Sequence, residues 1–161
     1  MRVTRELRAL ILVVLVFVAA VVKSPRMLEP SSISSILLWI PLLTVMAVGQ
    51  MLVIVSRGID VSIGSILGFT GIAVGLIFRA HPGMSVFVGG GFALAIGAVL
   101  GLINGGLVAW VRIPPIIVTL GTLSAFRGAA FIISKGDQIN ANDLPDALTN
   151  WSIHGPLKIG G

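Results

Sequence analysis

Residues 82–111 read PGMSVFVGGGFALAIGAVLGLINGGLVAWV and contain no charged side chain. Two more uncharged runs precede them, 27 residues long at 30–56 and 18 residues long at 61–78. A helix needs about 20 predominantly apolar residues to cross a hydrocarbon core about 30 Å thick. The sequence therefore predicts a membrane protein whose spans are helices.

The composition of the whole chain agrees with a membrane location. Of its 161 residues, 56% are apolar and 11% are charged, and the mean hydropathy is +1.07. About a quarter of the residues in soluble domains are charged, and disordered chains have low hydrophobicity, so both classes are excluded. The net charge of +5 comes from scattered basic residues, which cannot neutralise a run of phosphates. Nucleic acid is therefore excluded as a partner, and membrane lipids are expected instead.

We expect an all-α fold, a polytopic transmembrane helical bundle of about five spans with kinked or broken helices. The expected spans cover residues 7–23, 32–55, 61–78, 85–110 and 114–134. Residues 1–134 thus form the transmembrane region, and 135–161 form an extramembrane loop or tail. Inside the second span, Pro41 removes a helix hydrogen bond and predicts a kink. The break before the third span contains Gly58 as a turn residue and Asp60 as a candidate N-cap.

The amino-terminal segment decides the predicted orientation. Arg2, Arg5 and Arg8 precede the apolar run 9–22, which favours an uncleaved first helix that enters the membrane from the cytoplasm. A cleavable signal peptide has the same pattern and stays an alternative. The tail from residue 135 is net acidic, which suits the outer side. We therefore expect a multi-pass protein with a cytoplasmic amino terminus.

Glycines recur at helical spacing in the third and fourth predicted spans. Spacings of three and four residues place small side chains on one helix face, where two helices can approach closely in lipid. The glycines that we expect at such packing faces are Gly64, Gly68, Gly71, Gly75, Gly97, Gly101 and Gly105. These faces predict contacts within a bundle or an oligomer, and a substrate path bounded by them is the alternative.

Polar residues within the apolar runs are candidates for function, because a charge at mid-bilayer costs at least about 2.5 kcal/mol. Arg127 lies inside the fifth run. Either it faces the bundle interior or a water-filled cavity, or the run does not cross as a straight helix. Gln50 and Asn104 can form hydrogen bonds between helices, which are worth about 0.6–2 kcal/mol each in membranes.

No set of catalytic, cofactor-binding or metal-binding residues is predicted. The triplet Gly89, Gly90 and Gly91 lacks the Lys and Ser or Thr that a nucleotide-binding loop needs. His81 and His154 stand alone in predicted loops, without the neighbouring ligands of a zinc site. The chain has no cysteine, which excludes disulfides and thiolate metal sites. We therefore expect a chain that is not an enzyme and needs no cofactor.

Two groups of motifs point to a family. The first is GQMLVI at 49–54 followed by GIDVSIGS at 58–65. The second is GLING at 101–105, IPPIIVTLGT at 113–122 and the Arg-Gly pair at 127–128. In this order, they resemble the membrane permeases of bacterial ABC sugar importers of the ribose, rhamnose and autoinducer-2 type.

The resemblance implies a transmembrane subunit that forms the translocation pathway of an ATP-driven sugar importer in the bacterial inner membrane. It implies three partners: a cytoplasmic ABC ATPase, a periplasmic sugar-binding protein and a second permease subunit in a homo- or heterodimer. ATP would be hydrolysed by the ATPase and not by this chain. Motif residues expected to shape the helix breaks and the pathway are Gln50, Asp60, Ser62, Asn104, Thr119, Thr122 and Arg127.

Length separates this chain from the family that it resembles, whose members are about twice as long. We therefore expect an incomplete chain, the amino-terminal half of a permease. Two other classes stay open: a small oligomeric secondary carrier driven by an ion gradient, and a membrane remnant that transports nothing. The sequence leaves the substrate open among ribose, xylose, rhamnose and autoinducer-2.

Overall fold

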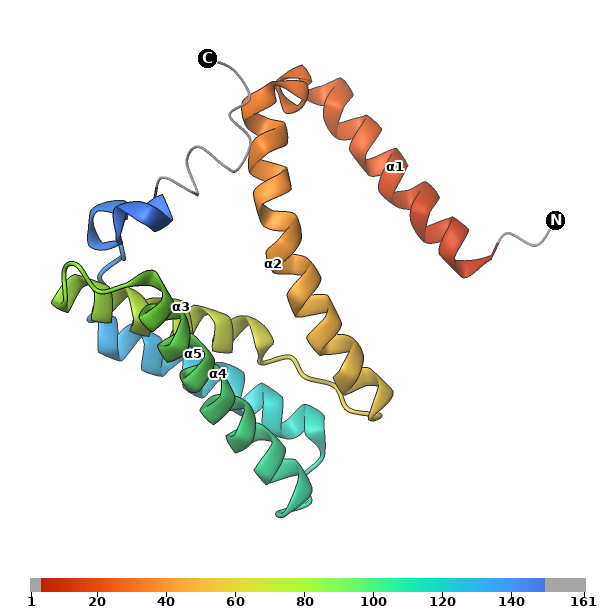
Figure 1. The fold of residues 1–161 in the computed structure, drawn as a ribbon. Helices are drawn as coiled ribbons and strands as arrows, with labels where there is room; N and C mark the ends of the chain where they lie inside the picture. Colours follow the sequence, from red (N-terminus) through yellow and green to blue (C-terminus); the bar gives the residue numbers. More distant parts are fainter. Residues whose placement is uncertain (1–3, 150–161) are drawn as a thin grey trace. The chain divides into compact units, whose positions relative to one another are not determined.

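The computed structural model describes residues 4–149, and all the regular structure in this range is helical. The α-helices are α1 (Arg5–Lys23), α2 (Pro30–Val55), α3 (Ile63–Ala80), α4 (Val86–Ala109) and α5 (Pro115–Ser134), with 3-10 helices η1 (Pro25–Leu28) and η2 (Ala141–Asp143). Figure 1 shows the order of these elements along the chain. The predicted all-α class is confirmed. The predicted tail is described only to residue 149, so His154 lies outside the described residues.

Four helices, α2 to α5, are long and apolar enough to cross a membrane, by length and composition. This confirms the polytopic transmembrane class. The helix α1 coincides with the first predicted span but is not among these four, so its crossing stays a prediction. The boundary between the membrane region and the tail also stays a prediction.

The chain divides into two compact units, and α2 contributes to both. In the first, residues 4–43, the Thr4 hydroxyl caps α1 by accepting from the Leu7 N–H at 3.4 Å. The Ser32 hydroxyl donates to the Arg26 carbonyl at 2.9 Å and ties the start of α2 to η1. The helix α2 then continues through Pro41.

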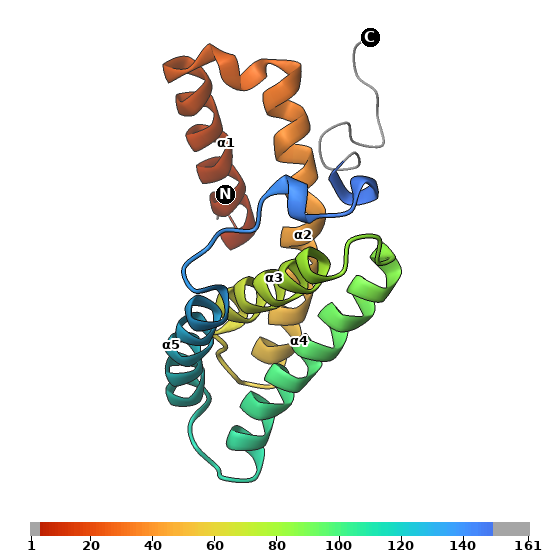
Figure 2. The same ribbon diagram turned by 90° about the vertical axis from the view of Figure 1, so that its left-hand side faces the viewer.

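The second unit contains the end of α2 and the helices α3, α4 and α5. Here α3 packs against both α4 and α5 (Figures 1 and 2). The most buried apolar side chains of the described residues are Phe78, Leu100, Val118, Phe126 and Ala130, and the most buried polar ones are Ser62, Asn104, Thr119, Thr122 and Ser134. Large apolar side chains cover the outside of the same unit; Phe87, for example, is 92% exposed. Polar groups inside and apolar groups outside are typical of helices that face lipid.

Charged residues close several helices at their carboxyl ends. Arg57 has a φ of 60°, its N–H donates to the Ile54 carbonyl, and the Gly58 N–H donates to the Val53 carbonyl, both at 2.9 Å. This is a Schellman motif, which ends α2 with a residue in the left-handed conformation. The left-handed residue of the turn is therefore Arg57, and the predicted turn residue Gly58 follows it.

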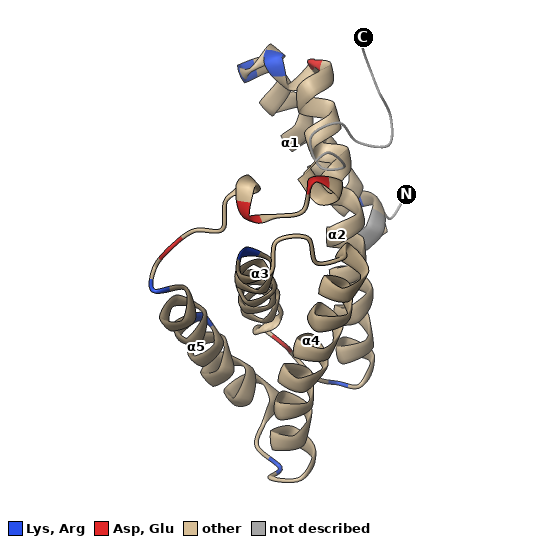
Figure 3. Cartoon of the chain, turned by 60° about the vertical axis from the view of Figure 1, so that its left-hand side comes forward, with Lys and Arg blue, Asp and Glu red and all other residues tan. Residues whose placement is uncertain are grey.

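Two other basic residues share this backbone conformation. Arg112, just past α4, has a φ of 61°, and Lys135, directly after α5, has a φ of 53°. Figure 3 shows that charged positions lie mostly at helix ends and in loops. A cation at the carboxyl end of a helix interacts favourably with the negative pole of the helix dipole.

Candidate functional site

The break between α2 and α3 is built around the side chain of Asp60. One carboxylate oxygen of Asp60, Oδ1, accepts from the Ser62 backbone N–H at 2.7 Å and from the Ser62 hydroxyl at 2.6 Å. Such an Asx turn competes with helix and holds the chain in a tight bend. Asp60 is therefore not the predicted N-cap of α3. That position belongs to Ser62, whose carbonyl accepts from the backbone N–H groups of Ser65 and Ile66.

Ser62 joins this bend to α4. Its side chain is completely buried, and its hydroxyl oxygen accepts from the Asn104 amide nitrogen Nδ2 at 2.7 Å. A hydroxyl has one proton to donate and lone pairs that accept, so Ser62 donates to Asp60 and accepts from Asn104 at once. Asn104 is only 6% exposed. The three residues form a continuous hydrogen-bonded chain from the middle of one sequence motif to the other.

Two more helices hold the same segment by its backbone. The Gln50 amide of α2 donates to the Asp60 carbonyl. The Thr119 hydroxyl of α5 donates to the Ile59 carbonyl at 3.2 Å. Non-helical backbone needs such partners at membrane depth, because lipid offers none. The segment 57–62 is thus attached by side chains of α2, α4 and α5.

The cluster lies near one end of the second unit. Asn104 is five residues before the end of α4 and Thr119 is four residues after the start of α5. At a rise of 1.5 Å per residue, both lie within about 8 Å of the helix ends. The carboxyl ends of α2 and α4 and the amino ends of α3 and α5 therefore meet at this cluster.

Some polar atoms of the cluster have no partner among the described residues. The amide oxygens Gln50 Oε1 and Asn104 Oδ1 are both buried and accept no hydrogen bond. An unpaired buried acceptor costs about 1–3 kcal/mol. The cluster can therefore take up hydrogen-bond donors, such as water or a hydroxyl group.

The cluster brings together five of the seven predicted motif residues. Thr122 lies one turn further along α5, where its hydroxyl donates to the Thr119 carbonyl at 3.4 Å. Arg127 is exposed, and it forms no ion pair in residues 4–149. It lies apart from the cluster, and its place in the pathway stays a prediction.

The predicted packing glycines differ in their surroundings. A Cβ on Gly75 would lie 2.8 Å from the Ile139 side chain, so this glycine allows a close approach. A Cβ on any of the other six would meet nothing within 4 Å: Gly64, Gly68, Gly71, Gly97, Gly101 and Gly105. Their role as packing faces stays a prediction.

A second polar group, missed by sequence reasoning, lies at the other end of α3. The Arg79 guanidinium donates to the Asp143 carboxylate at 2.9 Å and to the Gln138 carbonyl at 2.7 Å. Asp137 lies further away, at 3.9 Å. The hydrogen bond from Arg79, with a second from the Asn140 N–H, lowers the pKa of Asp143 below its ordinary value. The sequence offered only the net acidic tail from residue 135, which was predicted on the outer side.

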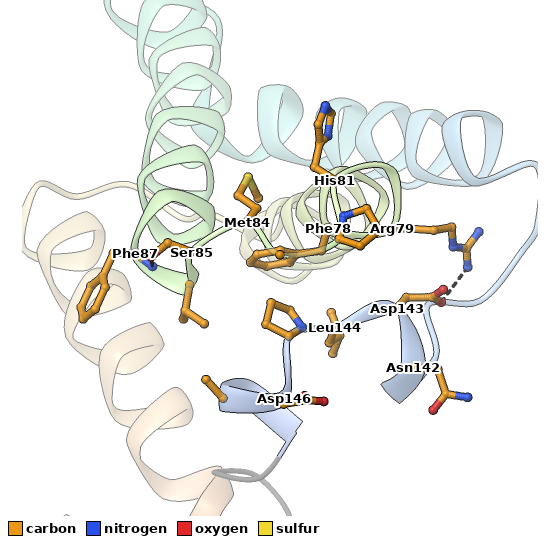
Figure 4. A pocket seen from close by; sticks show the side chains of 15 residues that line it. Phe78, Arg79, His81, Met84, Ser85, Phe87, Asn142, Asp143, Leu144 and Asp146 are labelled. Atoms are coloured by element: carbon orange, nitrogen blue, oxygen red, sulfur yellow. Dashed lines mark hydrogen bonds and ion pairs between the residues drawn. The ribbon is translucent and has the colours of Figure 1, made fainter.

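This group borders a pocket of about 560 Å³ (Figure 4). Its walls are the turn between α3 and α4 on one side and the segment 142–147 on the other. No three His, Asp or Glu side chains in residues 4–149 could hold a metal ion together.

Comparison with known proteins identifies the family. Residues 32–149 match the family described as "Branched-chain amino acid transport system / permease component". The chain belongs to this permease family. Both motif groups and all residues of the buried cluster lie inside the matched range. The prediction that the chain is a permease component of a bacterial importer, and not its ATPase, is confirmed.

Similar curated proteins are permeases as well. The chain is 39% identical over 156 residues to the "Autoinducer 2 import system permease protein LsrC" of Enterobacter sp. strain 638, covering 97% of this chain and 44% of that one. The LsrC protein of Shigella flexneri is 36% identical over the same length. LsrC of Yersinia pestis strain Pestoides F is 41% identical over 111 residues, or 69% of this chain and 30% of that one.

The chain thus spans less than half the length of the curated relatives that it matches. No solved structure matches it. The permease family is established by the sequence match, and the packing of α3 against α4 and α5 by the structure.

Proposed function

We propose that this permease chain forms part of the translocation pathway of an ATP-driven importer for a sugar or sugar-like signal, with autoinducer 2 as the leading candidate. The observation that carries the proposal is the family match over residues 32–149, together with relatives whose names specify autoinducer 2 import. In this proposal a cytoplasmic ABC ATPase supplies the energy. A periplasmic binding protein delivers the substrate, and a second permease subunit completes the pathway.

The buried cluster supports a role in the pathway and not in chemistry. A break between two membrane helices, held by hydroxyl and amide side chains from three helices, is how transporters keep polar groups at membrane depth. Unpaired acceptors on Gln50 and Asn104 can bind donors that a hydroxylated substrate or water provides. We infer that Asp60, Ser62 and Thr119 fix the bend and that the two amides face the moving solute or its water.

The proposed location is the bacterial inner membrane, with the amino terminus in the cytoplasm. This orientation places the cluster near the cytoplasmic face and the Arg79 group near the periplasmic face. It rests on the basic residues before the first apolar run and on the acidic residues after the last one.

Uptake measurements test the function. The chain is produced with its cognate ATPase and binding protein in cells that lack their own autoinducer 2 and ribose permeases, and uptake of each labelled solute is followed. We expect uptake that stops when ATP is depleted and continues when a protonophore removes the proton gradient while ATP is maintained.

Two outcomes would overturn the proposal. Uptake that requires the proton gradient but not ATP would identify a secondary carrier. A folded, membrane-inserted chain that supports no uptake with all partners present would identify a remnant. In the expected case, Asn104→Ala lowers uptake more strongly than Ser56→Ala, an exposed serine outside the cluster.

A further inference from the structure

The pocket beside Arg79 is a defined hollow at the end of the second unit opposite to the buried cluster. It lies between the end of α3, the start of α4 and the segment that follows α5. Its volume of about 560 Å³ falls within the range of small-molecule sites, about 300–1,000 Å³. All the lining residues belong to the second unit.

The floor of the pocket is an aromatic ring held in one position. Phe78 is only 4% exposed, and its ring lies directly over Gly89 of α4, where a Cβ would come within 2.2 Å of the ring. Met84, Leu144 and Pro145 add apolar surface around it (Figure 4). The ring holds these neighbours in place, and their apolar surface suits the carbon–hydrogen face of a small ligand, because binding then orders few side chains.

The wall opposite is acidic, and one of its carboxylates is held in place. The Asp143 oxygen Oδ2 accepts from Arg79 at 2.9 Å and from the Asn140 N–H at 2.8 Å, which also closes a capping box on η2. The other oxygen of Asp143 is left for a ligand. Asp146 lies on the same wall with an exposed side chain.

The charges of the lining select against anions. The lining contains two carboxylates, Asp143 and Asp146, and one arginine, Arg79. That arginine already donates from Nη2 to Asp143 and to the Gln138 carbonyl, and its Nη1 lies 3.9 Å from Asp137. A phosphate or carboxylate ligand would therefore meet two acids and an arginine that is already paired with carboxylates. A neutral ligand with hydroxyl donors would find acceptors on one side and an apolar surface on the other.

We propose that this pocket binds a small, neutral, polyhydroxylated molecule of the sugar class, before the molecule reaches the pathway. The inference rests on the proposed function, because it assigns a second contact to the same solute. Hydroxyl groups donate to Asp146 and to the free oxygen of Asp143, and the carbon face packs on the apolar side chains of Met84, Leu144 and Pro145.

The experiment uses the 161-residue chain in lipid nanodiscs, with D-ribose as the probe and saturation-transfer NMR as the readout. The variant is Asp146→Asn, and the matched control is Asp137→Asn. Asp137 lies on the same segment and is 72% exposed, but it does not line the pocket. We expect Asp146→Asn to weaken ribose binding by about tenfold, as expected for one hydrogen bond to a charged group. Asp137→Asn should leave it unchanged, and ribose 5-phosphate should not compete.

Three results would overturn the inference: no ribose signal from the parent chain, equal affinity in Asp146→Asn and the parent, or full competition by ribose 5-phosphate. These results are distinguishable from a failure of the proposed function. If the parent chain gives no ribose signal and Asp146→Asn shows normal ATP-driven uptake, the pocket is rejected as a binding site and the proposed function stands. If Asp146→Asn loses the ribose signal of the parent chain but neither protein supports ATP-driven uptake, the binding site stands and the proposed function is rejected.

Discussion

The Ser62 hydroxyl is the smallest group on which the buried cluster depends. It is fully buried, donates to Asp60 and accepts from Asn104, so its loss leaves the Asn104 amide nitrogen without its partner and leaves Asp60 Oδ1 with the backbone N–H of residue 62 alone. Residues at the edge of the cluster have backbone partners as well and are less critical. A single oxygen therefore connects the bend before α3 to α4.

We expect Ser62→Ala to lower the free energy of unfolding by about 1–3 kcal/mol, the cost of leaving buried polar groups unpaired. The measurement is unfolding in mixed micelles titrated with SDS, followed by circular dichroism. Ser56→Ala is the control, since its hydroxyl is exposed and donates only to the Val53 carbonyl at 2.8 Å. The control should change by less than about 0.5 kcal/mol. Equal losses in the two variants would contradict the connecting role of Ser62.

Among the elements, α3 contacts α4 where the Phe78 ring covers Gly89. A Cβ at Gly89 would lie 2.2 Å from a ring carbon, whereas one at the next residue, Gly90, would meet nothing within 4 Å. Two adjacent glycines of one helix thus differ in the space that is available for a side chain. The reason is their position on the helix, because a step of one residue turns the side chain by about 100°.

We expect Gly89→Ala to lower the free energy of unfolding by about 1–3 kcal/mol, because the ring and the helix must move apart. Gly90→Ala should leave it unchanged or raise it by up to about 1 kcal/mol, since alanine favours helix over glycine. The same SDS titration measures both. If Gly90→Ala were the more destabilising, a packing partner on that face would have to exist.

The helices themselves could be predicted from sequence, because long uncharged runs leave the backbone few other ways to satisfy its hydrogen bonds in lipid. Contacts between elements were harder to predict. Gln50, Asp60, Ser62, Asn104 and Thr119 were selected because they belong to motifs. The structure adds that the first four are connected by hydrogen bonds and that Thr119 bonds to the Ile59 carbonyl of the same bend. The Arg79–Asp143 pair was missed, because 64 residues separate its members and no local pattern connects them.

For the whole molecule, orientation in the membrane is the main open prediction. The two ends of the second unit differ chemically: one holds the buried cluster, and the other holds the Arg79 group and the pocket. The proposed function places the first toward the ATPase and the second toward the binding protein. The orientation therefore decides which partner each end can meet.

The cysteine-free chain allows a direct test of orientation. We expect a cysteine from Lys135→Cys to be labelled by a membrane-impermeant thiol reagent added to intact cells, and one from Arg112→Cys to be labelled only after lysis. The pair is well matched, because both residues are exposed and have left-handed backbones, with φ of 53° and 61°. The reverse labelling pattern would invert the topology.

The left-handed cations also have a mechanical consequence. Lys135 directly follows α5, Arg57 follows α2 by two residues and Arg112 follows α4 by three. A non-glycine residue in this conformation costs about 1–2 kcal/mol, and drawing its charge to the bilayer centre costs at least about 2.5 kcal/mol more. Because no flexible spacer separates the helix from the charge, the helix cannot shift far along its own axis. We expect these helices to move by tilting about their anchored ends, and not by sliding through the bilayer.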